Sequence, residues 1–536
     1  MVGASRSGTN YAKSGQPLER LKERTRGIER PYQVFTLLLA ALPILAGSCC
    51  ERAPRIPQPR LVVLYATCTL NKDYISPYDA RIPYTPALKK FSDEALVFER
   101  HVTEAGVSGI AYASIFSGAQ ADAHQVYQHP RVLDDQLYLI SEAFGDAGYD
   151  VHYWQGHKMA TSELNYVQGV PAENIHKIDE LKSVREGLFE GDPALMGILN
   201  RLGEDPDYKA LILVAFTVTH AAYNRQVMPD EVDNFTRRHP DLAQVQKARD
   251  AESLLALYEE HRLALQWNYA ETAATLGLTA RQERRLAALL DLYYRTDLAL
   301  LDVLFGRFMR TLRSAGAYDE ALIVVTADHG ELLKRKNALF LWGHGLQLAP
   351  EVVTVPLIIR PPKGAFPPGR FEAVTRSIDI FPTLAGLCNL TLPEETQVQG
   401  VDLSAAILGD EEAPDLLGLS HTKVLNRPLM ELFKDWDHVK RFYPRSDPDL
   451  IWVSARRGDL FHKIRHLGEA HWAREVYDLA NDPTETTNLY EAGNAEQERV
   501  FGYLESYKHR LIDHYTDHDL SPEETEEHLR GLGYIK

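Results

Sequence analysis

Short apolar runs recur along the chain from residue 60 onward, and longer stretches with helical periodicity separate them. Such runs, without strict polar–apolar alternation, are typical of strands buried on both faces of a parallel sheet. Helices are predicted between the runs, each followed closely by a glycine. The predicted strands are Leu61–Ala66, Leu211–Phe216, Leu322–Thr326 and Val355–Ile359, and the clearest helices are Gln136–Ala147 and Leu286–Ser314.

This alternation predicts an α/β fold with a mostly parallel central sheet and helices on both faces. Residues 225–290 are charged and helix-prone and contain no apolar strand, so we interpret them as a helical insertion in a main domain over residues 60–410. The pattern then changes to short strand-like segments, such as Phe461–Ile464, and a helix over Ala495–Leu511. A smaller C-terminal α+β subdomain is therefore predicted over residues 411–536.

The first 60 residues have a different pattern. A basic segment precedes an apolar run, Val34–Ala46, that is shorter than the ~20 residues needed to cross a bilayer and typical of a signal peptide. The following Gly47-Ser48-Cys49 resembles a bacterial lipoprotein box. Residues 1–48 are thus predicted to be a signal peptide, cleaved or with a lipid on Cys49, and the proline-rich residues 49–59 a linker. Export follows, to the bacterial periplasm or to a membrane through this N-terminal anchor or lipid.

Composition excludes several classes of protein. A net charge of −17 argues against a nucleic-acid partner, because such proteins carry a basic patch or stripe. The 45% hydrophobic content is typical of a globular chain. The four cysteines match neither a disulfide scaffold nor a paired zinc spacing.

Polar side chains that are suited to catalysis follow the predicted strands. Asp328 and His329 come directly after one strand, where a carboxylate and an imidazole can share a metal ion and Gly330 allows a tight turn. His220 follows another strand, and His344 lies between two glycines before the next one. Because the carboxyl ends of parallel strands meet at one edge, these side chains are expected to converge there. For each histidine alone, the alternative is a hydrogen-bonded structural role.

Taken in order, these segments resemble the sulfatase family of the alkaline-phosphatase-like superfamily. The resemblance extends from Leu61 onward, apart from the helical insertion. The segments that carry it are Cys68-Thr69-Leu70-Asn71, Thr85-Pro86-Ala87-Leu88, Ser108 to Gly118, Thr326-Ala327-Asp328-His329-Gly330-Glu331, Gly343-His344-Gly345, Asp379-Ile380-Phe381-Pro382-Thr383 and Tyr477-Asp478-Leu479.

The resemblance implies an alkaline-phosphatase-like fold and metal-assisted hydrolysis of sulfate or phosphate esters of a small molecule or glycan. The implied site residues are Ser108, His220 and His344 for catalysis, and Asp328, His329 and Cys68 for a divalent metal.

Two departures from the family pattern put this activity in question. Cys68 stands where the family has its first metal-binding aspartate; a thiolate suits zinc, whereas calcium requires oxygen ligands. The alternative for Cys68 is a buried apolar side chain. Ser108 lacks the proline and arginine of the family's Cys/Ser-x-Pro-x-Arg segment, with Ile110 and Tyr112 in their places. Formylglycine is therefore not expected, and Ser108 would act unmodified or merely cap its helix.

Asn71 replaces a second arginine of the family pattern, and His157 or Lys158 would be the source of the lost positive charge. Three hypotheses remain open: an exported ester hydrolase, a phosphoryl or phosphoethanolamine-type transferase, and a catalytically impaired pseudo-sulfatase that serves as a binding protein.

Overall fold

The computed structural model describes residues 56–178, 187–221, 223, 229–240, 242–247, 249–267, 269–333, 341–424, 448–466 and 472–515. The predicted signal peptide, with Cys49, and most of the linker lie outside these ranges. The described residues belong to one compact unit, Pro54–Lys536. No helix in this described part is both long enough and apolar enough to cross a membrane.

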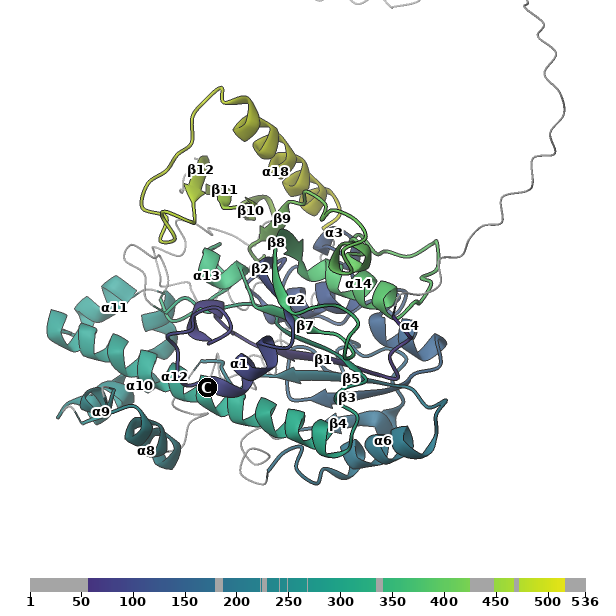
Figure 1. Cartoon of the computed structure of the whole chain (residues 1–536). Helices are drawn as coiled ribbons and strands as arrows, with labels where there is room; N and C mark the ends of the chain where they lie inside the picture. The colour runs from purple at the N-terminus through teal and green to yellow at the C-terminus, as the bar shows by residue number, and fades with distance from the viewer. Residues whose placement is uncertain are drawn as a thin grey trace, which may run out of the picture. The chain divides into compact units, whose positions relative to one another are not determined.

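An eight-stranded sheet forms the centre of this unit, in the order β4-β3-β5-β1-β6-β7-β2-β8 (Figure 1). Only β7 runs against its neighbours among the described strands, so the prediction of a mostly parallel sheet is confirmed. The strands are β1 (Leu61–Thr67), β2 (Leu96–Val102), β3 (Asp150–Gln155), β4 (Ile175–Lys177), β5 (Ala210–Phe216), β6 (Ala321–Ala327), β7 (Leu357–Arg360) and β8 (Gly369–Arg376).

The last of the four predicted strands differs from expectation in both start and direction. The sequence predicts Val355–Ile359 as a parallel strand, whereas β7 begins at Leu357 and is antiparallel to β6. Pro356 has no N–H group to give to a ladder, which explains the later start. Its carbonyl oxygen instead accepts a hydrogen bond from the Thr326 hydroxyl at 2.9 Å.

Helices cover both faces of the sheet, as predicted. One face packs on α1 (Pro86–Ser92), α6 (Pro193–Glu204) and α12 (Ala280–Ser314), and the other on α2 (Ser108–Ser117), α4 (Ile140–Asp146) and α14 (Ile380–Leu387). Alternate residues of β1 enter the two cores, Val63 on one side and Val62 on the other. Since full burial of each such side chain stabilises the fold by about 1.5–3 kcal/mol, a central strand must be apolar throughout.

Two predicted helices have different N-termini in the structure. The sequence places a helix start at Gln136, but α4 begins at Ile140, where Glu142 accepts a hydrogen bond from the backbone N–H of Leu139. The predicted helix from Leu286 begins earlier, at Ala280, because Thr279 and Gln282 form a capping box.

The described residues of the predicted insertion form four helices that pack with α12 or with each other, and they lie at one end of α12 in Figure 1. These are α8 (Pro229–Arg238), α9 (Ala243–Gln246), α10 (Ala251–Trp267) and α11 (Tyr269–Thr275).

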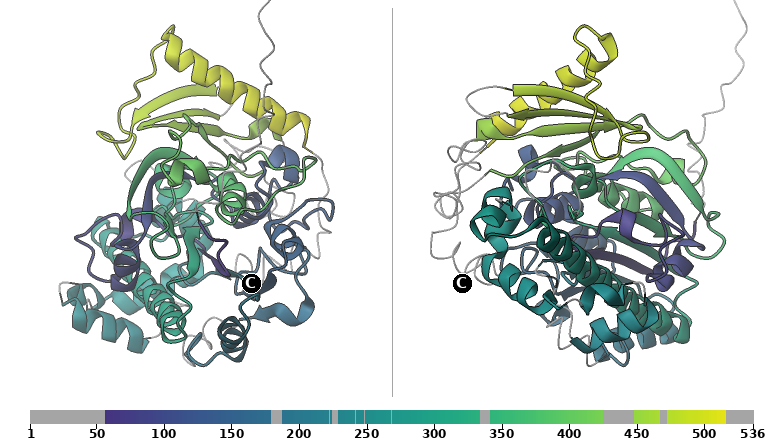
Figure 2. Two further views of the ribbon diagram at one scale, coloured as in Figure 1. Left: turned by 45° about the vertical axis from the view of Figure 1, so that its right-hand side comes forward. Right: turned by 90° about the vertical axis from the view of Figure 1, so that its left-hand side faces the viewer.

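The C-terminal region has a separate antiparallel sheet in the order β12-β11-β10-β9, with α18 (Ala495–Asp513) along one face (Figure 2). Its strands are β9 (Gly418–His421), β10 (Val453–Arg457), β11 (Leu460–His466) and β12 (Trp472–Asp478). Phe501 and Leu504 of α18 pack on Val453 and Val476 of the sheet. The predicted α+β character of this region is therefore confirmed, and the predicted strand-like segment Phe461–Ile464 lies within β11.

Candidate active site

Three central strands end side by side at the edge where the candidate residues gather. Thr67 at the end of β1 pairs with Phe216 of β5 and with Ala327 of β6. The ladder continues for one residue, since the Cys68 N–H donates to the Phe216 carbonyl at 2.8 Å and the Asp328 N–H to the Thr67 carbonyl at 3.1 Å. The register of the sheet thus sets Cys68 beside Asp328.

Gly330 is required by close approach rather than by an unusual dihedral angle. A Cβ atom at this position would lie 2.0 Å from the Glu351 carbonyl oxygen, which no side chain tolerates. Its N–H donates to the Val352 carbonyl at 2.8 Å. The glycine therefore lets the segment after β6 pack against the segment before β7.

Ser108 lies within reach of both strand ends. Its Oγ is 3.2 Å from His329 Nε2 and 3.5 Å from Cys68 Sγ, and the residue is 2% exposed. Helix α2 begins at Ser108 itself, with Val107 as its N-cap residue and no side-chain capping bond. The alternative that Ser108 serves as an N-cap is therefore wrong.

His329 is held in one tautomer. Its Nδ1 lies 2.9 Å from the Gly330 carbonyl oxygen, which can only accept, so the ring proton is on Nδ1. The lone pair of Nε2 consequently faces Ser108, whose hydroxyl donates to it. This is the arrangement of a nucleophile with a positioned proton acceptor.

Asp328 has one satisfied oxygen and one unsatisfied oxygen. Oδ1 accepts from the backbone N–H groups of His329 and Thr69, at 2.6 and 3.2 Å. Oδ2 is buried and makes no hydrogen bond; it lies 3.6 Å from His329 Nε2 and 3.7 Å from His157 Nε2. A buried carboxylate oxygen without a donor is an attractive position for a cation.

His157 has the opposite tautomer to His329. The Met159 N–H donates to its Nδ1 at 3.0 Å, so the neutral ring carries its proton on Nε2 and directs it at Asp328. Burial lowers the pKa of His157 to about 3. His157 therefore contributes an N–H group and not the positive charge suggested for it, and Lys158 is exposed.

The donor atoms fit a soft divalent ion better than calcium. The ligand atoms of Cys68, His157 and Asp328 all lie within 4.8 Å of one another, and Cys68 Sγ is 3.9 Å from His329 Nε2. Calcium takes about 6–8 oxygens, and only Asp328 offers a carboxylate in this group. Sulfur, imidazole nitrogen and one carboxylate suit zinc. Burial, with nearby Asp328, raises the pKa of the Cys68 thiol, so metal binding would have to displace its proton.

The remaining two predicted histidines pack beside His329, with their rings tilted or edge-on to one another. The rings of His344 and His329 are 4.2 Å apart between centroids, and those of His220 and His344 are 5.3 Å apart. His344 Nδ1 lies 3.3 Å from Glu331 Oε1. Desolvation lowers the pKa of His220 to about 3 and that of His344 well below its usual range, so both rings are neutral. The structure thus brings together all six predicted residues, while their roles stay predictions.

The positions of the two missing arginines are filled by uncharged side chains. Asn71 Nδ2 donates to the Glu331 carbonyl at 3.0 Å, which ties the loop after β1 to the loop after β6. The Tyr112 ring lies 5.0 Å from that of His157. Sequence reasoning assigned no role to Glu331 and overlooked His129 and Lys423, two buried residues beside this cluster. No local motif marks His129 or Lys423, because the tertiary fold brings them there.

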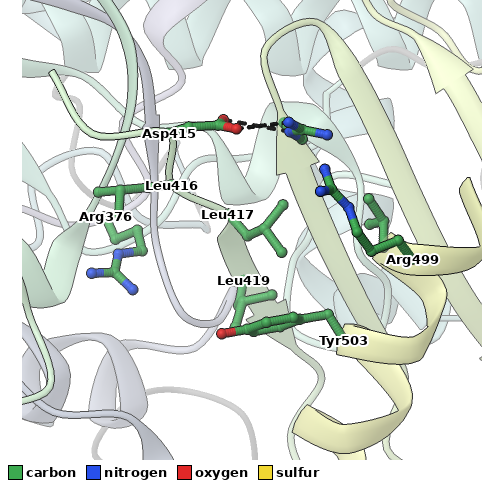
Figure 3. Close-up of a pocket in the computed structure, with 9 residues that line it drawn as sticks. Arg376, Asp415, Leu416, Leu417, Leu419, Arg499 and Tyr503 are labelled. Carbon is green, nitrogen blue, oxygen red and sulfur yellow. Dashed lines mark hydrogen bonds and ion pairs between the residues drawn. The ribbon is translucent and has the colours of Figure 1, made fainter. Parts of the chain in front are cut away.

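A cavity of about 350 Å³ lies elsewhere, between the end of β8, the C-terminal sheet and α18 (Figure 3). None of the six predicted residues lines it. Its walls combine leucines with three arginines, one of which, Arg457, pairs with Asp415 at 2.7 Å. The lining residues are Arg376, Asp415, Leu416, Leu417, Leu419, Arg457, Arg499, Val500 and Tyr503.

Comparison with known families gives one match that covers more than half of the chain. Residues 60–390 match the family model described as Sulfatase. This range contains β1 to β8 and all six residues of the candidate site.

Individual relatives are similar over shorter stretches. The N-acetylglucosamine-6-O-sulfatase of Bacteroides thetaiotaomicron is 26% identical over 235 residues, which are 44% of this chain and 37% of that protein. Human arylsulfatase A is 32% identical over 213 residues, 35% of this chain and 37% of the other. The chain thus spans less than half the length of these curated relatives.

Solved structures share the fold over most of the chain. A phosphonate monoester hydrolase of Agrobacterium radiobacter covers 85% of this chain and 96% of its own, with a TM-score of 0.57 and 20% identity. A 2-O glycosaminoglycan sulfatase, BT1596, covers 87% of this chain and 96% of its own, with a TM-score of 0.57 and 13% identity. At these identities the likeness shows the fold alone.

Proposed function

The chain belongs to the sulfatase family, and on that premise we propose that it hydrolyses sulfate or phosphate esters with unmodified Ser108 as the nucleophile. The observation that carries the proposal is the 3.2 Å contact between Ser108 Oγ and His329 Nε2. The hydroxyl passes its proton to this lone pair as Oγ attacks sulfur or phosphorus. Gly330 holds the ring in place, and Asp328 Oδ2, 3.6 Å away, stabilises the charge that His329 acquires.

Cys68, Asp328 and His329 would hold a divalent metal, and the sulfur ligand favours zinc over calcium. His157 could replace His329 only by giving up its hydrogen bond from Met159. When bound, such an ion supplies the Lewis acidity that lowers the pKa of the Ser108 hydroxyl and offsets the charge of the ester, in place of the His329 lone pair. The Nε2 lone pair of His329 can accept the Ser108 proton or bind the metal, but not both at once. The dependence of turnover on metal therefore shows which of the two roles His329 has.

His344 and His220 face the leaving-group side in this proposal. Each ring donates its Nδ1 proton, His344 to Glu331 and His220 to the Ala221 carbonyl, so each keeps a lone pair on Nε2. When the anionic ester binds, Nε2 of either ring can take up a proton and then donate it to the oxygen of the leaving group. His344 is the better general acid, since Glu331 would stabilise its protonated form.

Phosphate esters are the favoured substrates. Without an aldehyde hydrate at position 108, cleavage of a sulfate ester leaves a sulfated serine that water must displace. The names of the bacterial relatives, which include sulfatases of amino sugars, favour a small-molecule or glycan ester. The N-terminal segment supports export, to the periplasm or as a membrane-anchored lipoprotein.

The test is turnover of 4-nitrophenyl phosphate and 4-nitrophenyl sulfate by the purified protein, with its metal content measured by mass spectrometry. We expect faster turnover of the phosphate ester and a loss on the order of 10³-fold in Ser108→Ala. Ser117→Ala is the matched control, because Ser117 lies in the same helix and donates only to the Ala113 carbonyl. Turnover that survives Ser108→Ala would contradict the nucleophile. No turnover of either ester would favour the alternative of a catalytically impaired pseudo-sulfatase that binds esters. The loss of both arginines of the family pattern supports that alternative.

Peptide mass spectrometry tests whether residue 108 remains a serine. The converting enzymes of the family recognise proline and arginine beside their target, and Ile110 and Tyr112 offer neither the rigid turn nor the charge. We expect the unmodified mass for the peptide that contains Ser108. A loss of about two mass units, the signature of an alcohol oxidised to an aldehyde, would contradict this and restore the family's sulfatase chemistry.

A further inference from the structure

A buried lysine of the C-terminal region lies beside the candidate site. Lys423 follows β9 and is only 4% exposed. The backbone on both sides of it is fixed, since the Thr422 N–H donates to the Trp452 carbonyl and the Val424 N–H to the Tyr127 carbonyl, both at 3.0 Å. The first bond belongs to the C-terminal subdomain and the second joins the main domain, so Lys423 stands where the two meet.

The lysine stem packs at the junction of two site segments. Lys423 Cε lies 3.8 Å from the point that a Cβ atom on Gly345 would occupy. The same point is 3.4 Å from the Gly106 carbonyl oxygen and 3.2 Å from the Val107 side chain. Gly345 follows His344, and Val107 precedes Ser108. The lysine stem therefore lies beside Gly345, the neighbour of His344, at a point that the Val107 side chain also approaches.

The ammonium group acts on two imidazole rings of the cluster. Its positive charge contributes to the lowered pKa values of His129 and His344, although desolvation is the larger cause for both. His129 in turn packs on the first turn of α2, where its Cβ is only 2.8 Å from the position of a Cβ on Gly109. The charge of Lys423 thus affects two histidines near Ser108, His129 and His344.

The candidate site needs positive charge to bind an anionic ester, and Lys423 can supply it. A sulfate or phosphate ester brings negative charge into a cluster that already contains Asp328 and Glu331. The arginines of the family pattern are absent from positions 71 and 112. Burial lowers the pKa of Lys423 to about 7, so an anion placed beside it would restore its full charge.

We propose that Lys423 binds the anionic group of the ester, in place of the two missing arginines. This inference rests on the proposed function, because it assigns a ligand to the same site. It adds that the C-terminal subdomain completes the anion site, which the main domain alone lacks.

Binding of an inorganic anion tests the proposal without turnover. Calorimetric titrations of the full chain with inorganic phosphate and with sulfate would be compared in the Ser108→Ala background, with and without Lys423→Met. We expect the dissociation constant for phosphate to rise at least about tenfold in Lys423→Met and to recover in part in Lys423→Arg, which keeps the charge. Lys463→Met is the matched control, because Lys463 is also a buried lysine of the C-terminal sheet and its ammonium group forms an ion pair with Glu485. It should leave the constant unchanged.

A second readout uses the unaltered protein, so the test does not depend on the folding of a variant. Phosphate should protect Lys423 from reductive methylation, measured by peptide mass spectrometry. An unchanged phosphate constant in Lys423→Met, no phosphate or sulfate binding at about 10 mM (roughly tenfold above a millimolar dissociation constant), or no protection would each overturn the inference. Anion binding that needs Lys423 in a protein without esterase activity would instead overturn the proposed function and leave this inference standing.

Discussion

The segments after β1 and β6 lie side by side at one sheet edge, but they differ in how far they depart from the family pattern. After β6, Asp328, His329 and Glu331 stand as the pattern has them. After β1, Cys68 and Asn71 replace a metal-binding aspartate and an arginine. The backbones of both segments nevertheless follow the register of the sheet. The position of the candidate site is therefore set by the sheet and not by the identity of the metal ligands.

Residues that are not candidate metal ligands hold the segment after β1, which departs from the family pattern. The Tyr294 hydroxyl donates to the Thr69 carbonyl at 2.7 Å and accepts from the Asn71 N–H at 2.9 Å. The Thr219 hydroxyl donates to the Cys68 carbonyl. These bonds stabilise the loop even though Thr69 has a φ of +50°, an unfavourable value for a β-branched residue. Side chains in this loop can therefore change without collapse of the edge.

Removal of the charge from the segment after β6, which matches the family pattern, should have the largest effect. Asp328→Asn leaves His329 without its neighbouring carboxylate and removes the anionic metal ligand, so we expect turnover to fall on the order of 10³-fold. Asp302→Asn is the control, since Asp302 is a buried carboxylate of α12 that accepts only the Ala87 and Leu88 N–H groups. A loss of less than tenfold in Asp328→Asn would show that this half does not carry the chemistry.

Restoration of the altered half should change the preferred metal. Cys68→Asp exchanges a sulfur ligand for oxygen, and we expect calcium to bind at least roughly tenfold tighter and zinc to bind more weakly. Equilibrium dialysis with metal analysis measures both. Cys388→Ala, at a second buried free cysteine of the described residues, should change neither affinity. If the unaltered protein retains one equivalent of calcium after dialysis, the interpretation of Cys68 is wrong.

Loss of the hydrogen bonds that hold the segment after β1 should have the smallest effect. Tyr294→Phe leaves the Thr69 carbonyl and the Asn71 N–H without their partner, at a cost of about 1–3 kcal/mol in the free energy of unfolding. Denaturant titration measures the loss. Tyr293→Phe, a half-buried neighbour on the same helix, should cost less than half as much. Equal stabilities for the two variants would contradict the supporting role of Tyr294.

Continuous apolar runs and short motifs made much of this predictable from sequence. Strands β1, β5 and β6 are buried on both faces, so their composition reveals them. Strands β2 and β8 were not predicted, because β2 contains charged residues and only two of the eight residues of β8 are buried. The same limit applies to the site. Ser108 and His329 lie in motifs, whereas the tautomer of His157 depends on a backbone N–H, and Lys423 arrives through tertiary packing.

Helix α12 connects distant parts of this architecture. Its 35 residues extend for about 50 Å at 1.5 Å per residue. Insertion helices α8, α9 and α10 pack along it, and Tyr294 projects from it into the loop that carries Cys68. One helix therefore contacts the insertion and, through the Tyr294 hydroxyl, the backbone of the candidate site. Any displacement of α12 by the insertion would move Tyr294 and with it the hydrogen bonds that fix Thr69 and Asn71.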